Sequence, residues 1–225
     1  DDVKIWVSKL KDGKWAAPRV AASATMTQDK PAPCWNPVLF RNSDNSITLF
    51  FKQSGNWNNW RGMRTVSKDE GLTWSTPEEL SPKGNHGPIK NKPVRVGKRI
   101  ILPTSDEFTP DDWRVYFWIS DDDGKTWSRT PYVNQEGEIG GIQPSLLIHK
   151  NGDLQAVGRT PRDVGFIYQT WSRDGGKTWG KLTSTGLPNP NSGTDALTLH
   201  DGRHILVYNH TQNWKIRSPL NVAVS

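Results

Sequence analysis

Ser120-Asp121-Asp122-Asp123-Gly124-Lys125-Thr126-Trp127 follows a pattern, Ser-x-Asp-x-Gly-x-Thr-Trp, that residues 67–74 and 172–179 repeat. A degenerate copy lies at residues 8–15. The first serines of the three full copies are 53 and 52 residues apart. A fixed period of this length is typical of repeat proteins, so the sequence predicts several copies of one structural unit.

The chemistry of this octet, the name kept below for the eight-residue repeat, favours a tight turn between two strands. The Asp at its third position can accept backbone hydrogen bonds, and the Gly at its fifth adopts the positive φ of a hairpin bend. Thr and Trp then suit a strand, where the indole can pack against the neighbouring repeat. Asp121, Asp122 and Asp123 resemble part of a calcium loop, but no glutamate completes a twelve-residue ligand set. We therefore interpret these acids as turn formers and expect no metal and no cofactor.

Composition limits the classes of protein to consider. The 225 residues include 12 Trp, 20 Gly and 16 Pro, which suits many short strands joined by turns. A net charge of +6 favours an anionic partner, and because the basic residues are scattered we expect an acidic glycan and no nucleic acid. No apolar run is long enough for a membrane helix, and the first residues do not form a signal peptide. The single Cys34 leaves the compartment open.

The octets resemble the Asp-box repeats, also called BNR repeats, of the sialidase superfamily. Residues 35–38, 87–93 and 187–193 are similar to phrases of bacterial and plant sialidase-like BNR proteins. The resemblance implies an all-β fold, a β-propeller of four-stranded blades, with six blades in an intact parent. It also implies a glycosidase for acidic sugars. We further expect a monomer, extracellular or periplasmic, with no membrane partner. The octet is specific for the fold and weak evidence for function.

Hairpin signals divide the predicted single domain, 1–225, into repeats. Apolar alternation and turns such as Asn151-Gly152 predict four-stranded blades at about 32–80, 85–134 and 139–187. Half blades at about 1–20 and 190–225 bring the total to about four. No sustained 3.6-residue apolar period predicts a helix. The two halves hold complementary strands and would permit a four-bladed ring, but similarity to six-bladed sialidases favours part of a longer chain.

Polar side chains recur where the first strand of each repeat begins. They are Asn36, Lys90, Lys92, Gln143 and Asp195. Because these strand starts surround the central mouth of a propeller, the sequence predicts that they line a binding site there. The alternative is structural: Asn and Asp cap strand entries, and the prolines that follow stiffen them.

The similarity to sialidases extends to two arginines. Arg159, at the end of a second strand, and Arg217, before a third strand, resemble two of the three arginines that grip the substrate carboxylate in that family. A planar guanidinium suits this task because it binds a carboxylate through two hydrogen bonds and keeps its charge. Asp2 resembles the family's acid/base aspartate, which protonates the leaving oxygen.

Three departures limit this similarity. The family's first arginine would precede residue 1, and its nucleophilic tyrosine would follow residue 225. Gln143 stands where the family has a glutamate, and an amide cannot accept a proton as a carboxylate does. A complete sialidase mechanism therefore cannot be assembled from these 225 residues.

Other side chains leave two further functions open. His86 and Tyr208 could reach the mouth, where either could take a proton beside an arginine, as in a uronate-polysaccharide lyase. His149 and His204 lie beside turns and are expected to face solvent. The third function is a non-catalytic carbohydrate-binding propeller, which the Gln143 departure favours.

Overall fold

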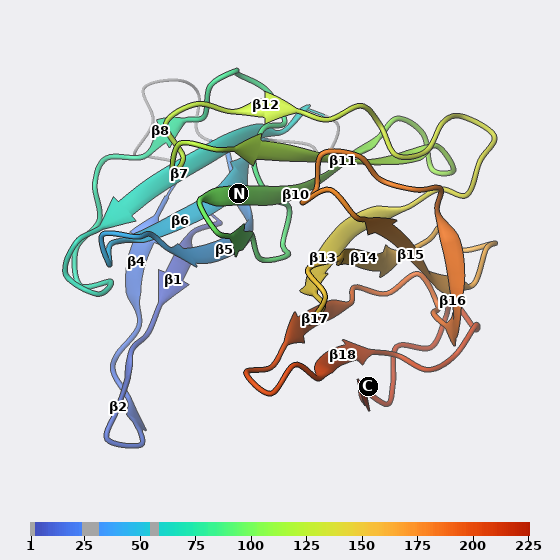
Figure 1. The fold of residues 1–225 in the computed structure, drawn as a ribbon. Coiled ribbons are helices and arrows are strands. Elements are labelled where there is room, and N and C mark those ends of the chain that lie inside the picture. The colour runs from blue at the N-terminus through green and yellow to red at the C-terminus, as the bar shows by residue number, and fades with distance from the viewer. Residues whose placement is uncertain (1–2, 24–31, 55–58) are drawn as a thin grey trace. The chain divides into compact units, whose positions relative to one another are not determined.

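The computed structural model describes residues 3–23, 32–54 and 59–225 (Figure 1). These ranges contain strands and turns and no α-helix. A helix long and apolar enough to cross a membrane is accordingly not found in them. The chain divides into two compact units, residues 1–90 and residues 91–225, each with its own antiparallel sheets.

The first unit contains one complete four-stranded sheet and a smaller strand pair. In the pair, β1 (Ile5–Val7) lies antiparallel to β4 (Arg19–Ala22), and the hairpin of β2 (Leu10–Lys11) and β3 (Lys14–Trp15) between them carries the degenerate octet. The four-stranded sheet consists, in chain order, of β5 (Cys34–Arg41), β6 (Ile47–Gln53), β7 (Arg61–Ser67) and β8 (Glu78–Glu79).

The second unit contains two four-stranded sheets and one three-stranded sheet. The first sheet consists of β9 (Val94–Val96), β10 (Arg99–Glu107), β11 (Trp113–Ser120) and β12 (Ser128–Arg129). The second consists of β13 (Ile142–Ile148), β14 (Leu154–Arg159), β15 (Phe166–Ser172) and β16 (Thr183–Pro188). The third consists of β17 (Asp195–Thr198), β18 (His204–Tyr208) and β19 (Asn221–Val224). Strand β13 contacts both β10 and β17, so the three sheets follow one another through it.

The octets form the turns that their chemistry predicts. In residues 120–127, Asp122 accepts hydrogen bonds from the backbone N–H groups of Lys125 at 3.1 Å and Thr126 at 2.8 Å, and from the Thr126 hydroxyl at 2.6 Å. Gly124 has a φ of 83° and donates its N–H to the Ser120 Oγ at 2.8 Å. Because these bonds stabilise the ionised carboxyl, the pKa of Asp122 lies well below its usual value. The interpretation as a turn former is confirmed.

The octet tryptophan also joins one sheet to the next, as expected. Trp179 stacks on Phe117 of β11 with ring centroids 4.1 Å apart and an interplanar angle of 20°. It packs against a buried cluster that includes Leu154 and Tyr168 of its own sheet. Since an aromatic side chain buries a large apolar area, this contact stabilises the junction of the two sheets. The all-β architecture of repeated four-stranded sheets is therefore confirmed.

Candidate functional site

Three strand ends of the second unit meet at one edge, called the site edge below. Ile142 at the start of β13 is paired with Arg159 at the end of β14. The backbone N–H of Gln143 donates to the Ser105 Oγ near the end of β10, at 3.1 Å. This bond ties the first two sheets together, so that Gln143, Arg159 and the end of β10 belong to the same edge.

Arg159 and Arg217 contact the same residue, Asn191. Arg159 Nη1 donates to the backbone oxygen and to the Oδ1 of Asn191, both at 3.0 Å. Arg217 Nη2 donates to the same backbone oxygen at 3.4 Å. The guanidinium carbon of Arg159 also lies 5.7 Å from the ring centroid of Trp113, within the range of a cation–π contact. The fold thus gathers two guanidinium groups, from β14 and from the loop before β19, at one carbonyl.

The charge of this arginine pair is poorly compensated. Among the described residues, neither Arg159 nor Arg217 has an acidic oxygen within ion-pair distance, and Arg159 Nε is buried without a hydrogen-bond partner. Burial lowers the pKa of Arg159, and the positive charge of Arg217 lowers it further, while Glu107 acts in the opposite sense. Burial in turn raises the pKa of Glu107 above its usual value. Such a positive and partly desolvated pair is suited to an anion.

Asp195 and Lys92 form a different kind of cluster at the start of β17. Lys92 Nζ donates to Asp195 Oδ2, and Asp195 Oδ1 accepts from the Ser145 hydroxyl at 3.1 Å. Asn91 Nδ2 donates to Ser145 Oγ at 2.6 Å and to the Thr194 backbone oxygen at 3.1 Å. Because Lys92 and Asp195 neutralise each other, this cluster joins three segments and contributes less net charge than the arginine pair.

Two polar residues that precede proline interrupt their strands. Asn36 and Gln143 have φ angles of 49° and 53°, and the strand register shifts at both places, between Trp35 and Val38 and between Ile142 and Ser145. A left-handed residue before proline is disfavoured by sterics, so each is a local strain that the surrounding sheet must maintain. The bulges at Asn36 and Gln143 turn a side chain out of the regular alternation, as binding sites often require. Lys90 also has a positive φ, of 65°, but lies outside the strands.

A family model described as the BNR repeat-like domain matches residues 1–225. The chain belongs to this family. A search of curated proteins returns no match for this BNR repeat-like protein.

Solved structures show where the same fold occurs. A protein of unknown function from Dyadobacter fermentans has a TM-score of 0.76 and 21% identity, over 98% of this chain and 67% of that protein. A Hadza microbial sialidase has a TM-score of 0.78 and 17% identity, over 99% of this chain and 50% of the sialidase. The Trypanosoma rangeli sialidase in complex with the inhibitor DANA has a TM-score of 0.71 and 15% identity, over 99% of this chain and 42% of that sialidase. The BNR repeat-like chain therefore has a propeller fold of the sialidase type and spans half or less of the length of these two sialidases.

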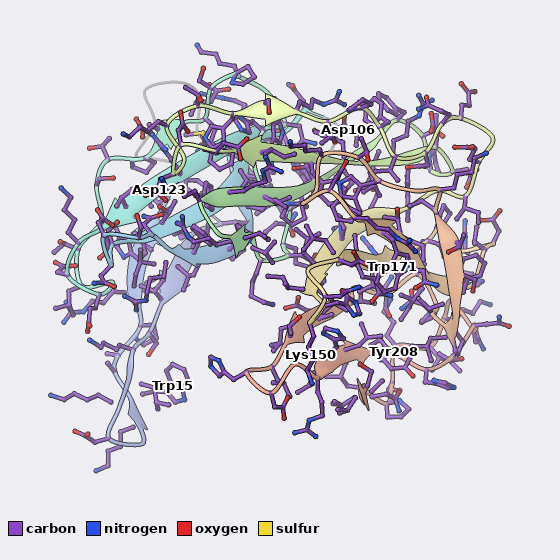
Figure 2. All side chains as sticks on the ribbon, viewed as in Figure 1. Trp15, Asp106, Asp123, Lys150, Trp171 and Tyr208 are labelled. Atoms are coloured by element: carbon purple, nitrogen blue, oxygen red, sulfur yellow. The ribbon has the colours of Figure 1, made fainter. Side chains whose placement is uncertain are left out.

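Tyr208 lies in the core and not on an open surface. Its side chain belongs to a buried cluster with Leu147, Ile167 and Ala196, and its hydroxyl contacts His210 Nδ1 at 2.5 Å. Figure 2 labels Tyr208 among the side chains of the second unit. The aromatic ring therefore has a packing role, and the hydroxyl is already engaged at the end of β18.

The other residues predicted to line the binding site are not part of the site edge. His86, Asn36 and Lys90 belong to the first unit. His86 is buried, and desolvation together with the charge of Lys52 lowers its pKa to about 4. It is therefore neutral at neutral pH. Asn36 and Lys90 are half-buried, and Asp2 lies outside the described residues.

Sequence reasoning missed Glu107, Trp113 and Asn191 at the site edge. Glu107 ends β10, the second strand of its sheet, just as Arg159 ends β14, the second strand of the next one. A comparison of second-strand ends across repeats could have found it. No sequence signal singles out Asn191, because its role depends on a loop that returns to Arg159.

Proposed function

We propose that this BNR repeat-like protein binds an acidic sugar at the site edge, as part of a sialidase-like glycoside hydrolase. The observation that carries the proposal is the pair Arg159 and Arg217, both bonded to the Asn191 carbonyl and neither ion-paired within the described ranges. A carboxylate between the two guanidinium groups would offset their repulsion and receive two-pronged hydrogen bonds. The Hadza and Trypanosoma rangeli structures, both named sialidases, support the same class of substrate.

Glu107 supplies a candidate proton donor beside that position. Its carboxyl interacts electrostatically with Arg159, and burial raises its pKa, which favours the protonated form. A raised pKa is what a general acid near neutral pH requires. In this proposal Glu107 contacts the sugar beside the arginine pair, and Gln143 contributes an amide at the same edge.

Fewer observations support the hypothesis of a uronate-polysaccharide lyase. Its base would be His86 or Tyr208, and Tyr208 is held in the core with its hydroxyl on His210. The proposal further includes a monomeric protein, located outside the cell or in the periplasm, whose two units form one propeller domain with the blades predicted from the sequence.

The direct test is calorimetric titration of the protein with N-acetylneuraminic acid and with its methyl ester, which lacks the negative charge. The proposal predicts an affinity for the acid at least tenfold above that for the ester, because only the acid can pair with both arginines. Equal affinities would refute carboxylate recognition. Incubation with a sialoside and with a uronate polysaccharide then separates the chemistries, since a hydrolase releases free sugar, a lyase releases an unsaturated product, and a binding protein releases neither.

A further inference from the structure

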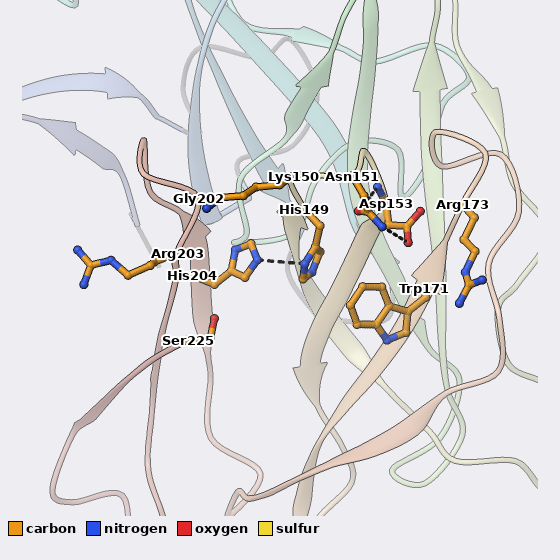
Figure 3. A pocket seen from close by; sticks show the side chains of 10 residues that line it. All are labelled: His149, Lys150, Asn151, Asp153, Trp171, Arg173, Gly202, Arg203, His204 and Ser225. Carbon is orange, nitrogen blue, oxygen red and sulfur yellow. Dashed lines mark hydrogen bonds between the residues drawn. The ribbon is translucent and has the colours of Figure 1, made fainter.

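A pocket lies at the opposite ends of the strands that carry Gln143 and Arg159. It is formed by the turn after β13, the start of β18 and strand β15, with a volume of about 760 Å³ (Figure 3). The side chains that matter below are His149, Lys150, Asp153, Trp171, Arg173 and His204. This face also carries the octet turns, and it is called the octet edge below.

One wall of the pocket is a continuous chain of hydrogen bonds between two sheets. Gln155 Nε2 donates to Gln169 Oε1 at 2.7 Å, so the Gln155 Oε1 is the acceptor for His149 Nε2 at 3.1 Å. His149 Nδ1 then accepts from His204 Nε2 at 3.3 Å. The directions of all these bonds agree when both imidazoles are neutral.

The chain of hydrogen bonds continues within the third sheet, from His204 of β18 to Thr198 of β17, and this bond fixes the tautomer of the His204 ring. Thr198 Oγ1 lies 3.0 Å from His204 Nδ1 and also accepts the Ile148 N–H at 2.9 Å, so its hydroxyl proton is available to His204. The two histidines are half-buried beside the pocket and bonded to each other, a contact that the sequence did not predict. Their rings form a T-shaped contact with centroids 4.4 Å apart.

This wall includes the indole ring of Trp171, which lines the pocket. Trp171 Nε1 donates to Gln169 Oε1 at 3.3 Å, which satisfies the polar edge of the ring. The His149 ring packs against the indole, with centroids 4.7 Å apart, and 37% of Trp171 remains exposed. A preorganised aromatic face beside polar groups is the arrangement that binds the apolar face of a sugar ring.

The charges around the indole are mostly positive. Lys150 and Arg173 have no ion-pair partner among the described residues, whereas Arg203 is paired with Asp201 at 2.7 Å. Asp153 accepts from Asn151 Nδ2 at 2.9 Å and retains acceptor capacity for hydroxyl groups.

The side chain of Lys150 lies close to Gly202, where the absence of a Cβ leaves room for it. A Cβ on Gly202 would lie 2.3 Å from Lys150 Cε, so the lysine stem crosses the turn at Gly202 closely. Figure 3 shows Lys150 next to Gly202, and Asp153 and Arg173 on the side of Trp171.

We propose that the octet edge carries a second binding site, for an anionic saccharide unit. The sugar ring stacks on Trp171, its hydroxyls bond to Asn151 and Asp153, and its anionic group pairs with Arg173, while Lys150 adds positive charge from the side of Gly202. An inorganic anion would leave the indole unused, and a neutral sugar would leave the two cations unpaired. The site is separate from the arginine pair, so the protein can hold a glycan at two points and gain avidity.

The experiment uses the full protein and 3′-sialyllactose as the probe, with lactose and inorganic sulfate as controls. In the Arg159→Ala variant, which removes the site-edge arginine, the probe should still bind. Adding Trp171→Ala should then weaken binding at least tenfold, and Trp171→Phe should weaken it less. Trp15→Ala serves as the matched control, because Trp15 is exposed in the hairpin of the first unit and should have no effect. The signal of the Trp171 indole N–H in NMR spectra should shift on titration.

Three results would overturn the proposal. If the double variant Arg159→Ala/Trp171→Ala bound the probe as tightly as Arg159→Ala does, the indole would not be part of the binding site. Lactose binding equal to that of the probe would remove the anionic requirement, and sulfate competing at equal affinity would leave a simple anion site. Failure of the site-edge proposal would give a different result: Arg159→Ala would bind the probe as tightly as the wild type does, while Trp171→Ala would still weaken binding.

Discussion

The aspartates of the octet turns and the arginines of the site edge, all in the second unit, use charge in opposite ways. At the octet edge, Asp122 and Asp174 each accept bonds from a backbone N–H and a threonine hydroxyl of their own turn. At the site edge, Arg159 and Arg217 share one carbonyl and have no ion-pair partner in the described part of the chain. The difference shows that the number of internal partners, rather than charge itself, separates charged side chains with a structural role from those that are available to a ligand.

The largest effect on stability is expected from Gly158→Ala, next to Arg159. A Cβ there would lie 2.7 Å from both the Ile142 backbone oxygen and Tyr168 Cε1, so β13 and β14 would have to move apart. The free energy of unfolding should fall by about 3 kcal/mol, measured by urea denaturation. Gly180→Ala is the matched control, because its nearest contact is 3.8 Å away and should be tolerated. Equal stability of the two variants would show that the site edge is not tightly packed.

Arg159→Ala should have the largest effect on binding. Loss of this partly buried guanidinium should weaken binding of N-acetylneuraminic acid at the site edge about 100-fold, or by about 2.7 kcal/mol. Arg99→Ala is the contrasting variant, since Arg99 is already paired with Asp121 at 2.7 Å and bonded to the Gly175 oxygen at 2.9 Å. It should lower the melting temperature and leave affinity unchanged. The comparison of the two edges fails if the two variants behave alike.

Ser120→Ala tests the structural side of the comparison. The buried hydroxyl accepts the Gly124 N–H at 2.8 Å and donates to Asp122 Oδ1 at 2.8 Å, and both partners would lose a bond. The free energy of unfolding should fall by about 2 kcal/mol, measured by chemical denaturation, without a change in ligand affinity. Ser128→Ala in the adjoining exposed strand is the control, because its hydroxyl makes only a 3.4 Å contact. A loss of affinity in Ser120→Ala would contradict a purely structural octet.

Arg217→Ala should weaken binding less than Arg159→Ala does. Arg217 is exposed, and its bond to Asn191 is longer, at 3.4 Å, so water screens its charge more effectively. We expect about a tenfold loss, which calorimetry at low and moderate salt would measure. The loss should shrink as salt is raised. An effect as large as that of Arg159→Ala, independent of salt, would show that the two arginines are equivalent.

The smallest effect is expected from acid titration of the octets. Hydrogen bonds donated by the Thr178 hydroxyl and N–H lower the pKa of Asp174 to about 2, below the usual value of an aspartate. Because the folded-state pKa is lowered, the turn stabilises the fold above about pH 4 and loses this contribution as the pH falls toward 2. The difference in melting temperature between the wild type and Asp174→Asn should therefore decrease over that range. A constant difference would mean that ionisation of Asp174 does not matter. The exposed carboxyl keeps the effect small.

How much of the site the sequence predicts depends on the range of the interactions. The octet turns were predictable because Ser120, Asp122 and Gly124 bond within one turn. Arg159 and Arg217 were found by resemblance, and the structure adds their shared partner Asn191. Glu107 and Trp113 were missed, since their importance comes from burial near Arg159 and not from any local pattern. The bond between His149 and His204 was not predicted, because it joins two sheets.

The sequence by itself determined the repeated antiparallel sheets and the turns between them. The physical reason is that hairpin strands, glycine bends and Asp-centred bonds all depend on residues a few positions apart. Only the tertiary structure decided which charges lack internal partners and which polar side chains form the wall beside Trp171. Those properties depend on burial and on contacts across sheets, such as Gln143 to Ser105 and His204 to His149, that residues distant in sequence make only after the chain has folded.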